Sequence, residues 1–306
     1  MPMEREAPTW LVTGAHGFLG ANLGHFLDGR AHRIGAARTA TPSPQFDQMV
    51  ANDLADPHAV AREISRLRPD VVVHAAALAD HARCETEPDL ATLINTEAPR
   101  VLAKAAAEVG ARFIHISTDA VFDGAAGPYT ETDEPNPFSV YGRTKLDGER
   151  GVLQNPQALV VRTNFFGWSP SGHRSILEFF VTSLSNGQQV KGFTDFTVTS
   201  IYVQHLCDAL WRLAHTDATG IVHVAASDVL SKYDFGVSVA QEFGLDASLI
   251  TPTESDIVPS RRRNIALDVS RASAILGAPL PSQRDGQAAA HADVALRQAL
   301  RAPAGQ

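Results

Sequence analysis

The chain has 306 residues, of which 44% are hydrophobic and 20% are charged, values close to those of ordinary globular proteins. Its formal net charge of −8 argues against general nucleic-acid binding, because a phosphate backbone is held by clustered Lys and Arg. Only two cysteines, Cys84 and Cys207, are present, and no apolar leader precedes the first strand-like run. We therefore expect a cytoplasmic protein without disulfides, secretion signal or membrane-spanning helix. The histidines are scattered without HExxH or His/Cys clustering, which predicts no metal site.

Short apolar runs alternate with helix-like segments through the first half of the chain. The runs cover residues 10–13, 33–37, 71–77, 112–117 and 158–163, and the first helix-like segment covers 21–28. The run at 71–73 is apolar without alternation, as expected for a parallel strand with helices on both faces of its sheet. Pro99 lies inside a helical stretch from 89 to 108 and predicts a helix boundary or kink just before it. The pattern predicts an α/β fold with a Rossmann-type, doubly wound parallel sheet.

The alternation of apolar runs and helix-like segments becomes irregular beyond about Gly167. We expect residues 1–166 to form the Rossmann domain, with 200–225 returning to it. Residues 167–199 and 226–306 are expected to form a smaller C-terminal substrate-binding lobe. The Ala- and Gln-rich tail from Gln287 is predicted to be helical until Pro303.

A glycine-rich turn follows the first strand-like run and opens a helix. Its pattern is GxxGxxG, at Gly14, Gly17 and Gly20. The first glycine allows a sharp strand-to-helix turn, the second lets a diphosphate approach the backbone, and the third permits close packing of helix on strand. Unpaired N–H groups of the first helical turn then face the anion. The turn predicts a dinucleotide site made of Gly14, His16, Gly17, Phe18, Leu19 and Gly20.

The end of the second strand predicts the kind of dinucleotide. Many NAD enzymes carry Asp or Glu there to bind the adenosine ribose hydroxyls. This chain has Arg38 at that point, and no carboxylate lies in the surrounding residues 35–39. A guanidinium attracts a phosphate on that ribose. We therefore expect NADP(H) to be preferred, with NAD(H) as the open alternative.

A YxxxK motif combines Tyr141 with Lys145. On a helix the two side chains share one face. A phenol has an unperturbed pKa of about 10, and lowering it by about three units requires roughly 4 kcal/mol in favour of the phenolate. An adjacent ammonium and an oxidised nicotinamide can supply that stabilisation. Ser117 and Thr118 lie at the carboxyl end of the strand-like segment 112–119, where ligands bind in open α/β sheets. We expect Thr118 to hold a substrate carbonyl while Tyr141 donates a proton to its oxygen as hydride arrives.

Six segments of the chain follow the order seen in dTDP-4-dehydrorhamnose reductase and its relatives: GAHGFLG, VVHAAA, LINTEA, STDAVFDGAAGPYTETDEPNPFSVYGRTKLDGE, VRTNFFG and RRRNIALD. The chain thus resembles this family of the extended short-chain dehydrogenase/reductases over nearly its whole length. The resemblance implies that Thr118, Tyr141 and Lys145 are catalytic. It further implies that Asp53 and Leu54 border the adenine, that Ala75, Ala76 and Ala77 line the cofactor, and that Asn95 supports the site. Ser117, Tyr141 and Lys145 are also expected to contact the cofactor, Lys145 through the nicotinamide ribose.

The chain departs from the family at positions that concern the substrate. Ala120 replaces the Tyr of STDYVFDG, so substrate contact is altered there. The related 4,6-dehydratases carry Glu at this position, as dehydration needs a second acid/base pair, so Ala120 argues against a dehydratase. Asn164 resembles the Asn with which sugar-nucleotide epimerases hold substrate phosphates, and Arg261 matches the Arg of a family RPxN segment. Asp119, Asn164 and Arg261 are therefore the predicted substrate residues.

Three functions remain compatible with the sequence. The first is NADPH-dependent reduction of a 4-keto group on a nucleotide-activated deoxysugar. The second is a catalytically silent NADP-binding protein resembling the regulatory subunit of methionine adenosyltransferase, which carries similar motifs. The third is a sugar-nucleotide epimerase, which needs only the Tyr and Thr groups. Superfamily resemblance makes a homodimer the default assembly; nucleic-acid and membrane partners are not expected.

Overall fold

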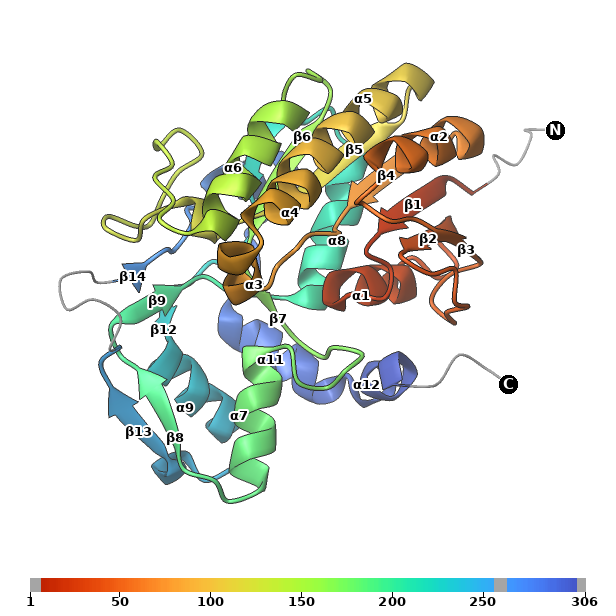
Figure 1. Ribbon diagram of the computed structural model, residues 1–306. Helices are drawn as coiled ribbons and strands as arrows, with labels where there is room; N and C mark the ends of the chain where they lie inside the picture. Colours follow the sequence, from red (N-terminus) through yellow and green to blue (C-terminus); the bar gives the residue numbers. More distant parts are fainter. Residues whose placement is uncertain (1–6, 256–262, 302–306) are drawn as a thin grey trace.

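The computed structural model describes residues 7–255 and 263–301. Its centre is a seven-stranded parallel sheet with the strand order β11-β6-β5-β4-β1-β2-β3 (Figure 1). The order reverses direction at β1, as in a doubly wound fold, so the predicted fold class is confirmed. The strands are β1 (Thr9–Thr13), β2 (His32–Ala37), β3 (Gln48–Ala51), β4 (Val71–His74), β5 (Arg112–Thr118), β6 (Leu159–Thr163) and β11 (Gly220–His223).

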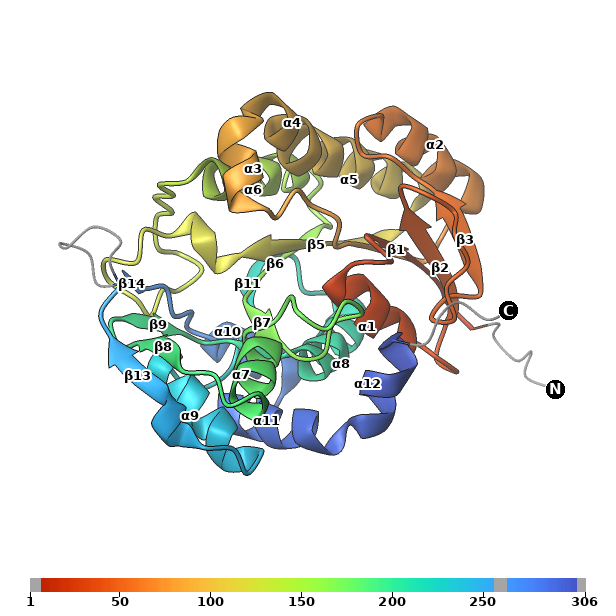
Figure 2. The ribbon, with the colours of Figure 1, turned by 60° about the horizontal axis from the view of Figure 1, so that its bottom comes forward.

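Helices cover both faces of this sheet (Figure 2). One layer contains α2 (Pro57–Leu67), α3 (His81–Thr86), α4 (Pro88–Thr92), α5 (Ala98–Val109) and α6 (Val140–Val152), and the opposite face carries α1 (Phe18–Phe26) and α8 (Val203–Ala214). A π-helical turn, Leu93–Glu97, joins α4 to α5, and Pro99 is the second residue of α5. Since a proline early in a helix has no N–H that needs a partner, the chain continues smoothly through this boundary. The boundary predicted just before Pro99 is confirmed.

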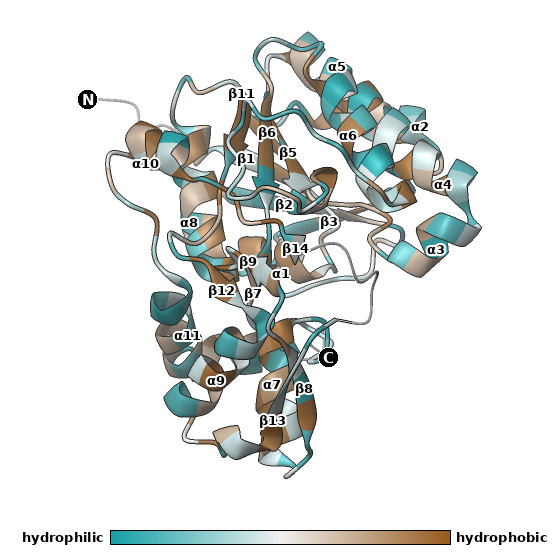
Figure 3. Ribbon diagram, turned by 90° about the vertical axis from the view of Figure 1, so that its left-hand side faces the viewer, coloured by the Kyte–Doolittle hydropathy of each residue, from teal (hydrophilic) through white to brown (hydrophobic). Residues whose placement is uncertain are grey.

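Successive residues of a strand point to opposite faces, and this divides the core in two. Trp10, Val12 and Val73 lie in a cluster on the α1/α8 side, whereas Leu11 and Val72 lie in a cluster under α2 and α5. Figure 3 shows the apolar residues gathered on the strands and on the inward faces of the helices. The unbroken apolar runs of the sequence therefore reflect strands that are buried on both faces.

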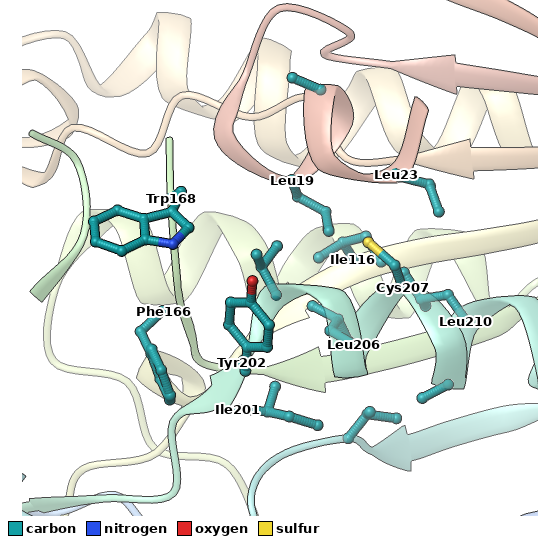
Figure 4. Close-up of a cluster of buried hydrophobic side chains, with 14 of the residues drawn as sticks. Leu19, Leu23, Ile116, Phe166, Trp168, Ile201, Tyr202, Leu206, Cys207 and Leu210 are labelled. Atoms are coloured by element: carbon teal, nitrogen blue, oxygen red, sulfur yellow. The ribbon is translucent and has the colours of Figure 1, made fainter. Parts of the chain in front are cut away.

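The C-terminal elements share the core cluster of the α1/α8 side. Figure 4 shows Leu19 and Leu23 of α1 facing Leu206 and Cys207 of α8, and Tyr202 and Phe166 belong to the same cluster. The elements outside the central sheet are β7 (Phe165–Phe166), α7 (Ile176–Ser185), β8 (Val190–Phe193), β9 (Phe196–Val198), β10 (Ile201–Tyr202), β12 (Leu230–Ser231), α9 (Lys232–Glu242), β13 (Ile250–Thr253), β14 (Arg263–Asn264), α10 (Ser270–Leu276), α11 (Gln283–Ala292) and α12 (Val294–Arg301). Short strands pair as β10-β7, β12-β9-β14 and β13-β8. The helical tail predicted from Gln287 is confirmed as far as Arg301.

The boundary between the two predicted parts stays a prediction. Within the segment 200–225, β11 pairs in parallel with β6, so this part of the chain extends the central sheet. That pairing supports the return of 200–225 to the Rossmann part. No helix within residues 7–255 and 263–301 is long and apolar enough to cross a membrane.

Candidate active site

The glycine turn lies between β1 and α1. Gly14 has a φ of +73°, and a Cβ there would lie 3.0 Å from the backbone of Ala76, in the segment that follows β4. A Cβ on Gly20 would lie only 2.1 Å from the Gly14 carbonyl oxygen, so α1 packs directly on the turn. Gly17 is the N-cap of α1 and supplies no side-chain cap, which leaves the first-turn N–H groups for another acceptor. The turn has the close backbone approach and the donors that a dinucleotide diphosphate requires.

The side chains of the other predicted dinucleotide residues in this turn differ in their exposure to solvent. His16 is exposed, with Nε2 3.3 Å from the carbonyl oxygen of Thr41, and the Phe18 ring packs at 5.1 Å from Phe165. Leu19 is buried in the core, so it can approach a ligand only through its backbone. Gly17 completes the turn by donating its N–H to the Gly14 carbonyl.

The predicted adenine and ribose residues follow the ends of two paired strands. Ala37 of β2 pairs with Ala51 of β3, so Arg38 and Asp53 come after neighbouring strand ends. Arg38 and Asp53 are exposed, whereas Leu54 is buried, with 8% of its surface exposed. The arrangement places a guanidinium and a carboxylate at the edge of the sheet near the glycine turn.

Asn95 connects the segment after β4 to helix α6. It lies in the π-helical turn and is buried. Its amide oxygen accepts a hydrogen bond from the Leu78 N–H at 2.8 Å, and its amide nitrogen donates to the Leu78 carbonyl and to Thr144 Oγ1. Since Leu78 directly follows Ala75 to Ala77, Asn95 fixes the backbone of this small-residue segment. The predicted β4 run ends three residues early, at His74, because this segment leaves the sheet beside the glycine turn.

Helix α6 begins against the end of β5 and so brings Tyr141 to Thr118. Ser139 caps the helix by accepting the Gly142 N–H at 3.0 Å. A Cβ on Gly142 would lie 2.3 Å from the Ala120 carbonyl oxygen, so only glycine permits this approach. The pKa of Tyr141 is raised to about 12, mainly by burial; a hydrogen bond with Thr118 opposes the rise, and the charge of Asp119 adds to it. The phenol is therefore in its protonated form at neutral pH.

Lys145 is buried, with 2% of its surface exposed, and points toward β5. Its Nζ donates to the Ile116 carbonyl at 2.7 Å and lies 3.2 Å from His115 Nε2. Burial lowers the pKa of Lys145 to about 8, and Glu149 opposes this decrease. In the chain itself burial dominates the pKa of Tyr141, and the Lys145 ammonium contacts β5. The lowering expected from Lys145 together with an oxidised nicotinamide stays a prediction.

Ser117 belongs to a buried network behind the tyrosine and lysine. Its Oγ donates to the Glu149 carboxylate, and Glu149 forms an ion pair with Arg162 at 2.7 Å. The side chains of Glu149 and Arg162 are 1% and 2% exposed. The Arg162 Nη1 has no hydrogen-bond partner within the described residues. The predicted cofactor contact of Ser117 therefore competes with a structural hydrogen bond that holds α6 to β5 and β6.

The predicted substrate residues Asp119 and Asn164 contact each other. Asn164 donates to an Asp119 carboxylate oxygen at 2.7 Å and accepts from Ser200 Oγ at 2.6 Å. Burial raises the pKa of Asp119 to about 6. The Asn164 amide thus uses its oxygen and one of the two hydrogens of its NH2 group. The second hydrogen is the donor that it can offer to a phosphate. Arg261, the third predicted substrate residue, lies outside the described residues.

Other residues near the site were not found from the sequence. His115 contacts Lys145, and the His81 ring lies 4.5 Å from the Tyr141 ring. The only sequence signal for Glu149 was its spacing of one helical turn beyond Lys145. No group of three or more His, Cys, Asp or Glu in the described part of the chain is arranged to hold a metal ion.

The chain matches known proteins over most of its length. Residues 9–295 match the family model described as "RmlD substrate binding domain". The chain is 34% identical over 291 residues to the probable low-salt glycan biosynthesis reductase Agl14 of Haloferax volcanii, covering 92% of this chain and 96% of that protein. It is 35% identical to dTDP-4-dehydrorhamnose reductase of Mycobacterium tuberculosis, covering 84% and 83%. It is also 34% identical to methionine adenosyltransferase 2 subunit beta of Bos taurus, covering 85% and 80%.

Solved structures show the same fold. A hypothetical dTDP-4-dehydrorhamnose reductase from Sulfolobus tokodaii superposes with a TM-score of 0.80 at 31% identity, covering 91% of this chain and 98% of the other. The Bacillus anthracis dTDP-4-dehydrorhamnose reductase in complex with NADP gives a TM-score of 0.81 at 23% identity, covering 92% and 97%. At the latter identity the likeness concerns the fold alone. The chain belongs to the RmlD substrate binding domain family, and the resemblance to the dTDP-4-dehydrorhamnose reductases that its motifs predicted is confirmed.

Proposed function

We propose that the chain is an NADPH-dependent reductase of a keto group, with C4 of a nucleotide-activated deoxysugar as its substrate position. One observation carries the proposal: the glycine turn follows β1, Thr118 ends β5, and Tyr141 and Lys145 lie on α6, which packs against β5. Strands β1, β4 and β5 are adjacent and parallel. The carboxyl ends of such strands meet at one edge, where open α/β sheets bind their ligands. The reductase relatives support the same reaction class.

The residues around the glycine turn fit a dinucleotide. Gly14 and Gly17 leave room for a diphosphate against the first turn of α1, and Arg38 supplies a cation for a phosphate on the adenosine ribose. The cofactor of the Bacillus anthracis structure, NADP, agrees with this choice. When bound, the reduced nicotinamide would supply hydride to the carbonyl carbon of the substrate.

Tyr141 supplies the proton that completes the reduction. With a pKa of about 12, its Oη keeps its proton at neutral pH until negative charge develops on the substrate oxygen. The proton then passes from Oη to that oxygen and leaves a hydroxyl group on the product. Thr118 Oγ1 positions the same carbonyl oxygen, and the buried Asp119 carboxylate opposes early loss of the Tyr141 proton.

Turnover of NADPH tests the proposal. Purified protein is incubated with NADPH and a panel of nucleotide-linked 4-keto-6-deoxysugars and small ketones, and the nicotinamide absorbance is followed. We expect consumption with at least one nucleotide-linked keto sugar. Tyr141→Phe is expected to lower kcat by about 10²- to 10⁴-fold while NADPH affinity stays within a few-fold of the wild type. A wild-type rate in Tyr141→Phe would contradict the role of the phenol.

The relation to methionine adenosyltransferase subunit beta supports a second candidate, a catalytically silent NADP-binding subunit. The two functions differ in turnover. A protein that binds NADPH but consumes none across the whole panel would favour the binding role. A sugar-nucleotide epimerase would convert its substrate without net loss of NADPH, which product analysis in the same assay detects.

A further inference from the structure

A buried pair of imidazoles lies between the glycine turn and Lys145. His74 ends β4 and His115 lies in β5; their rings stack at 5.3 Å with an interplanar angle of 20°. His74 Nδ1 is 2.8 Å from Thr13 Oγ1, and Thr13 in turn accepts the Ala76 N–H. His115 Nε2 is 3.2 Å from Lys145 Nζ. The two stacked imidazoles therefore lie between Thr13, the residue before Gly14, and Lys145, with one hydrogen-bond contact at each end.

Both imidazoles are uncharged in the folded protein. His115 is fully buried and His74 is 1% exposed, and burial lowers the pKa of both, with the nearby Lys145 ammonium lowering it further. A neutral imidazole has one nitrogen that accepts and one that donates. When Lys145 carries its charge, each of its N–H groups is a donor, so His115 Nε2 must be the accepting nitrogen.

We propose that His115 is a positioning residue for the reductase reaction, whose Nε2 accepts a hydrogen bond from the Lys145 ammonium and fixes that group beside β5. The inference rests on the proposed function for its link to catalysis, but the contact itself can be measured without turnover. Lys145 Nζ then has two acceptors, Ile116 O and His115 Nε2, in a site closed to water. His74 stacks on the His115 ring and keeps its edge directed at the lysine.

This tautomer has a consequence at the other ring nitrogen. With Nε2 accepting, the proton of His115 is on Nδ1, which has no hydrogen-bond partner within the described residues. A buried N–H without a partner is unfavourable. The Lys145 hydrogen bond is the interaction that offsets this cost, since it is charge-assisted and therefore stronger than a neutral one.

The titratable and charged groups around Lys145 come from three strands and its own helix. They are His115 on β5, His74 on β4, Tyr141 and Glu149 on α6, and Arg162 on β6, which is paired with Glu149. Of these, Glu149 favours the ammonium, and the two imidazoles contribute as neutral groups. Removing the acceptor nitrogen of His115 leaves the ammonium with a single acceptor. The charged form of Lys145 then becomes less stable, and the lysine loses its proton at lower pH.

Lysine NMR tests this directly, because the chain has only Lys104, Lys145, Lys191 and Lys232. The full-length protein is labelled with ¹³Cε-lysine, and loss of one signal in Lys145→Met assigns Lys145. We expect the Lys145 signal to titrate near its wild-type pKa of about 8 and to shift down by about one to two pH units in His115→Phe. His115→Gln restores an acceptor at a similar reach and is expected to recover most of the shift. An unchanged Lys145 titration in His115→Phe, or an equal shift in both variants, would overturn the proposal.

A measurement on the wild type covers the case in which His115→Phe does not fold. Long-range ¹H–¹⁵N spectra of the imidazoles, assigned with His115→Gln, are expected to show His115 protonated at Nδ1 at pH 7. Protonation at Nε2 at that pH would contradict the hydrogen bond. If turnover is found, the high-pH limb of kcat/KM for NADPH should move down in His115→Phe together with the NMR titration. A wild type that consumes no NADPH would refute the reductase function alone, since the NMR titrations still decide the His115 contact.

Discussion

Replacing Arg162 by Met removes one half of a buried ion pair. Arg162 Nε and Nη2 donate to the Glu149 carboxylate at 2.7 to 3.1 Å, and neither side chain is more than 2% exposed. Met has a similar length but no charge, so Arg162→Met leaves the Glu149 carboxylate buried with Ser117 as its remaining donor. Loss of one partner of a buried pair destabilises a protein by about 3–5 kcal/mol.

The double variant Arg162→Met/Glu149→Leu distinguishes the cost of an unpaired buried charge from the contribution of side-chain packing. Two apolar side chains of similar volume remove the uncompensated charge together with the ion pair, so we expect most of the lost stability to return. Ser117 then loses its acceptor, which costs about 1 kcal/mol. The double variant is therefore expected to be more stable than Arg162→Met alone by at least about 2 kcal/mol.

Urea unfolding at pH 7 measures these free energies, with fluorescence and circular dichroism as two independent probes of one transition. Arg150→Met is a matched control, because Arg150 pairs with Asp147 on the exposed face of α6, where both side chains are more than half exposed. Exposed ion pairs contribute about 0–1 kcal/mol to stability, so Arg150→Met should change the free energy of unfolding little. If Arg162→Met cost no more than Arg150→Met, or if the double variant were as unstable as Arg162→Met, the network would not hold α6 in place.

Three further predictions concern the cofactor turn and the site carboxylate. Gly20→Ala should abolish NADPH binding and lower the stability of the fold, since its Cβ would lie 2.1 Å from the Gly14 carbonyl oxygen. Fluorescence titration with NADPH checks this. Gly151→Ala is the control, because a Cβ there meets only a flexible arginine side chain. Arg38→Asp should weaken NADPH binding by about tenfold or more and leave NADH binding within a few-fold, because a carboxylate repels the ribose phosphate; equal losses for both would contradict this. Asp119 has a folded pKa of about 6, above its unfolded value, so its burial becomes more costly as pH rises from 4 to 6. Asp119→Asn should therefore raise Tm at pH 7.5 more than at pH 4.5, and equal changes at the two pH values would refute it.

Local patterns predicted the sheet because the strands are buried on both faces. The unbroken apolar runs around Val72 and Ile114 correspond to β4 and β5, whose side chains fill two separate clusters. By contrast, β3 was not predicted. It has only four residues, Gln48–Ala51, two of them exposed, so it carries neither an apolar run nor a clear alternation. Pairing with β2 forms this strand, and that long-range contact is not encoded in its own residues.

The site was predicted as far as its chemistry depends on short motifs. The glycine spacing predicted the turn, and the spacing of Tyr141 and Lys145 predicted a shared helix face. Their protonation is decided mainly by burial, and the segments that contact them are distant in the sequence: Lys145 contacts His115, and Tyr141 packs against His81. No short-range pattern reports the depth of burial at these positions. For that reason the sequence did not predict that burial raises the pKa of Tyr141 to about 12 in the chain itself.

Asp119 links the two halves of the site. It follows Thr118 at the end of β5, accepts a hydrogen bond from Asn164 after β6, and its carboxylate is stabilised by the charge of Lys232 from α9. The same carboxylate raises the pKa of Tyr141. A substrate group that draws Asn164 or Lys232 away from Asp119 therefore changes the proton affinity of the phenol as well as its own binding. In the proposed reductase reaction, we therefore expect substrate binding and proton transfer to be coupled through this buried carboxylate, independently of the side chain that Ala120 lacks.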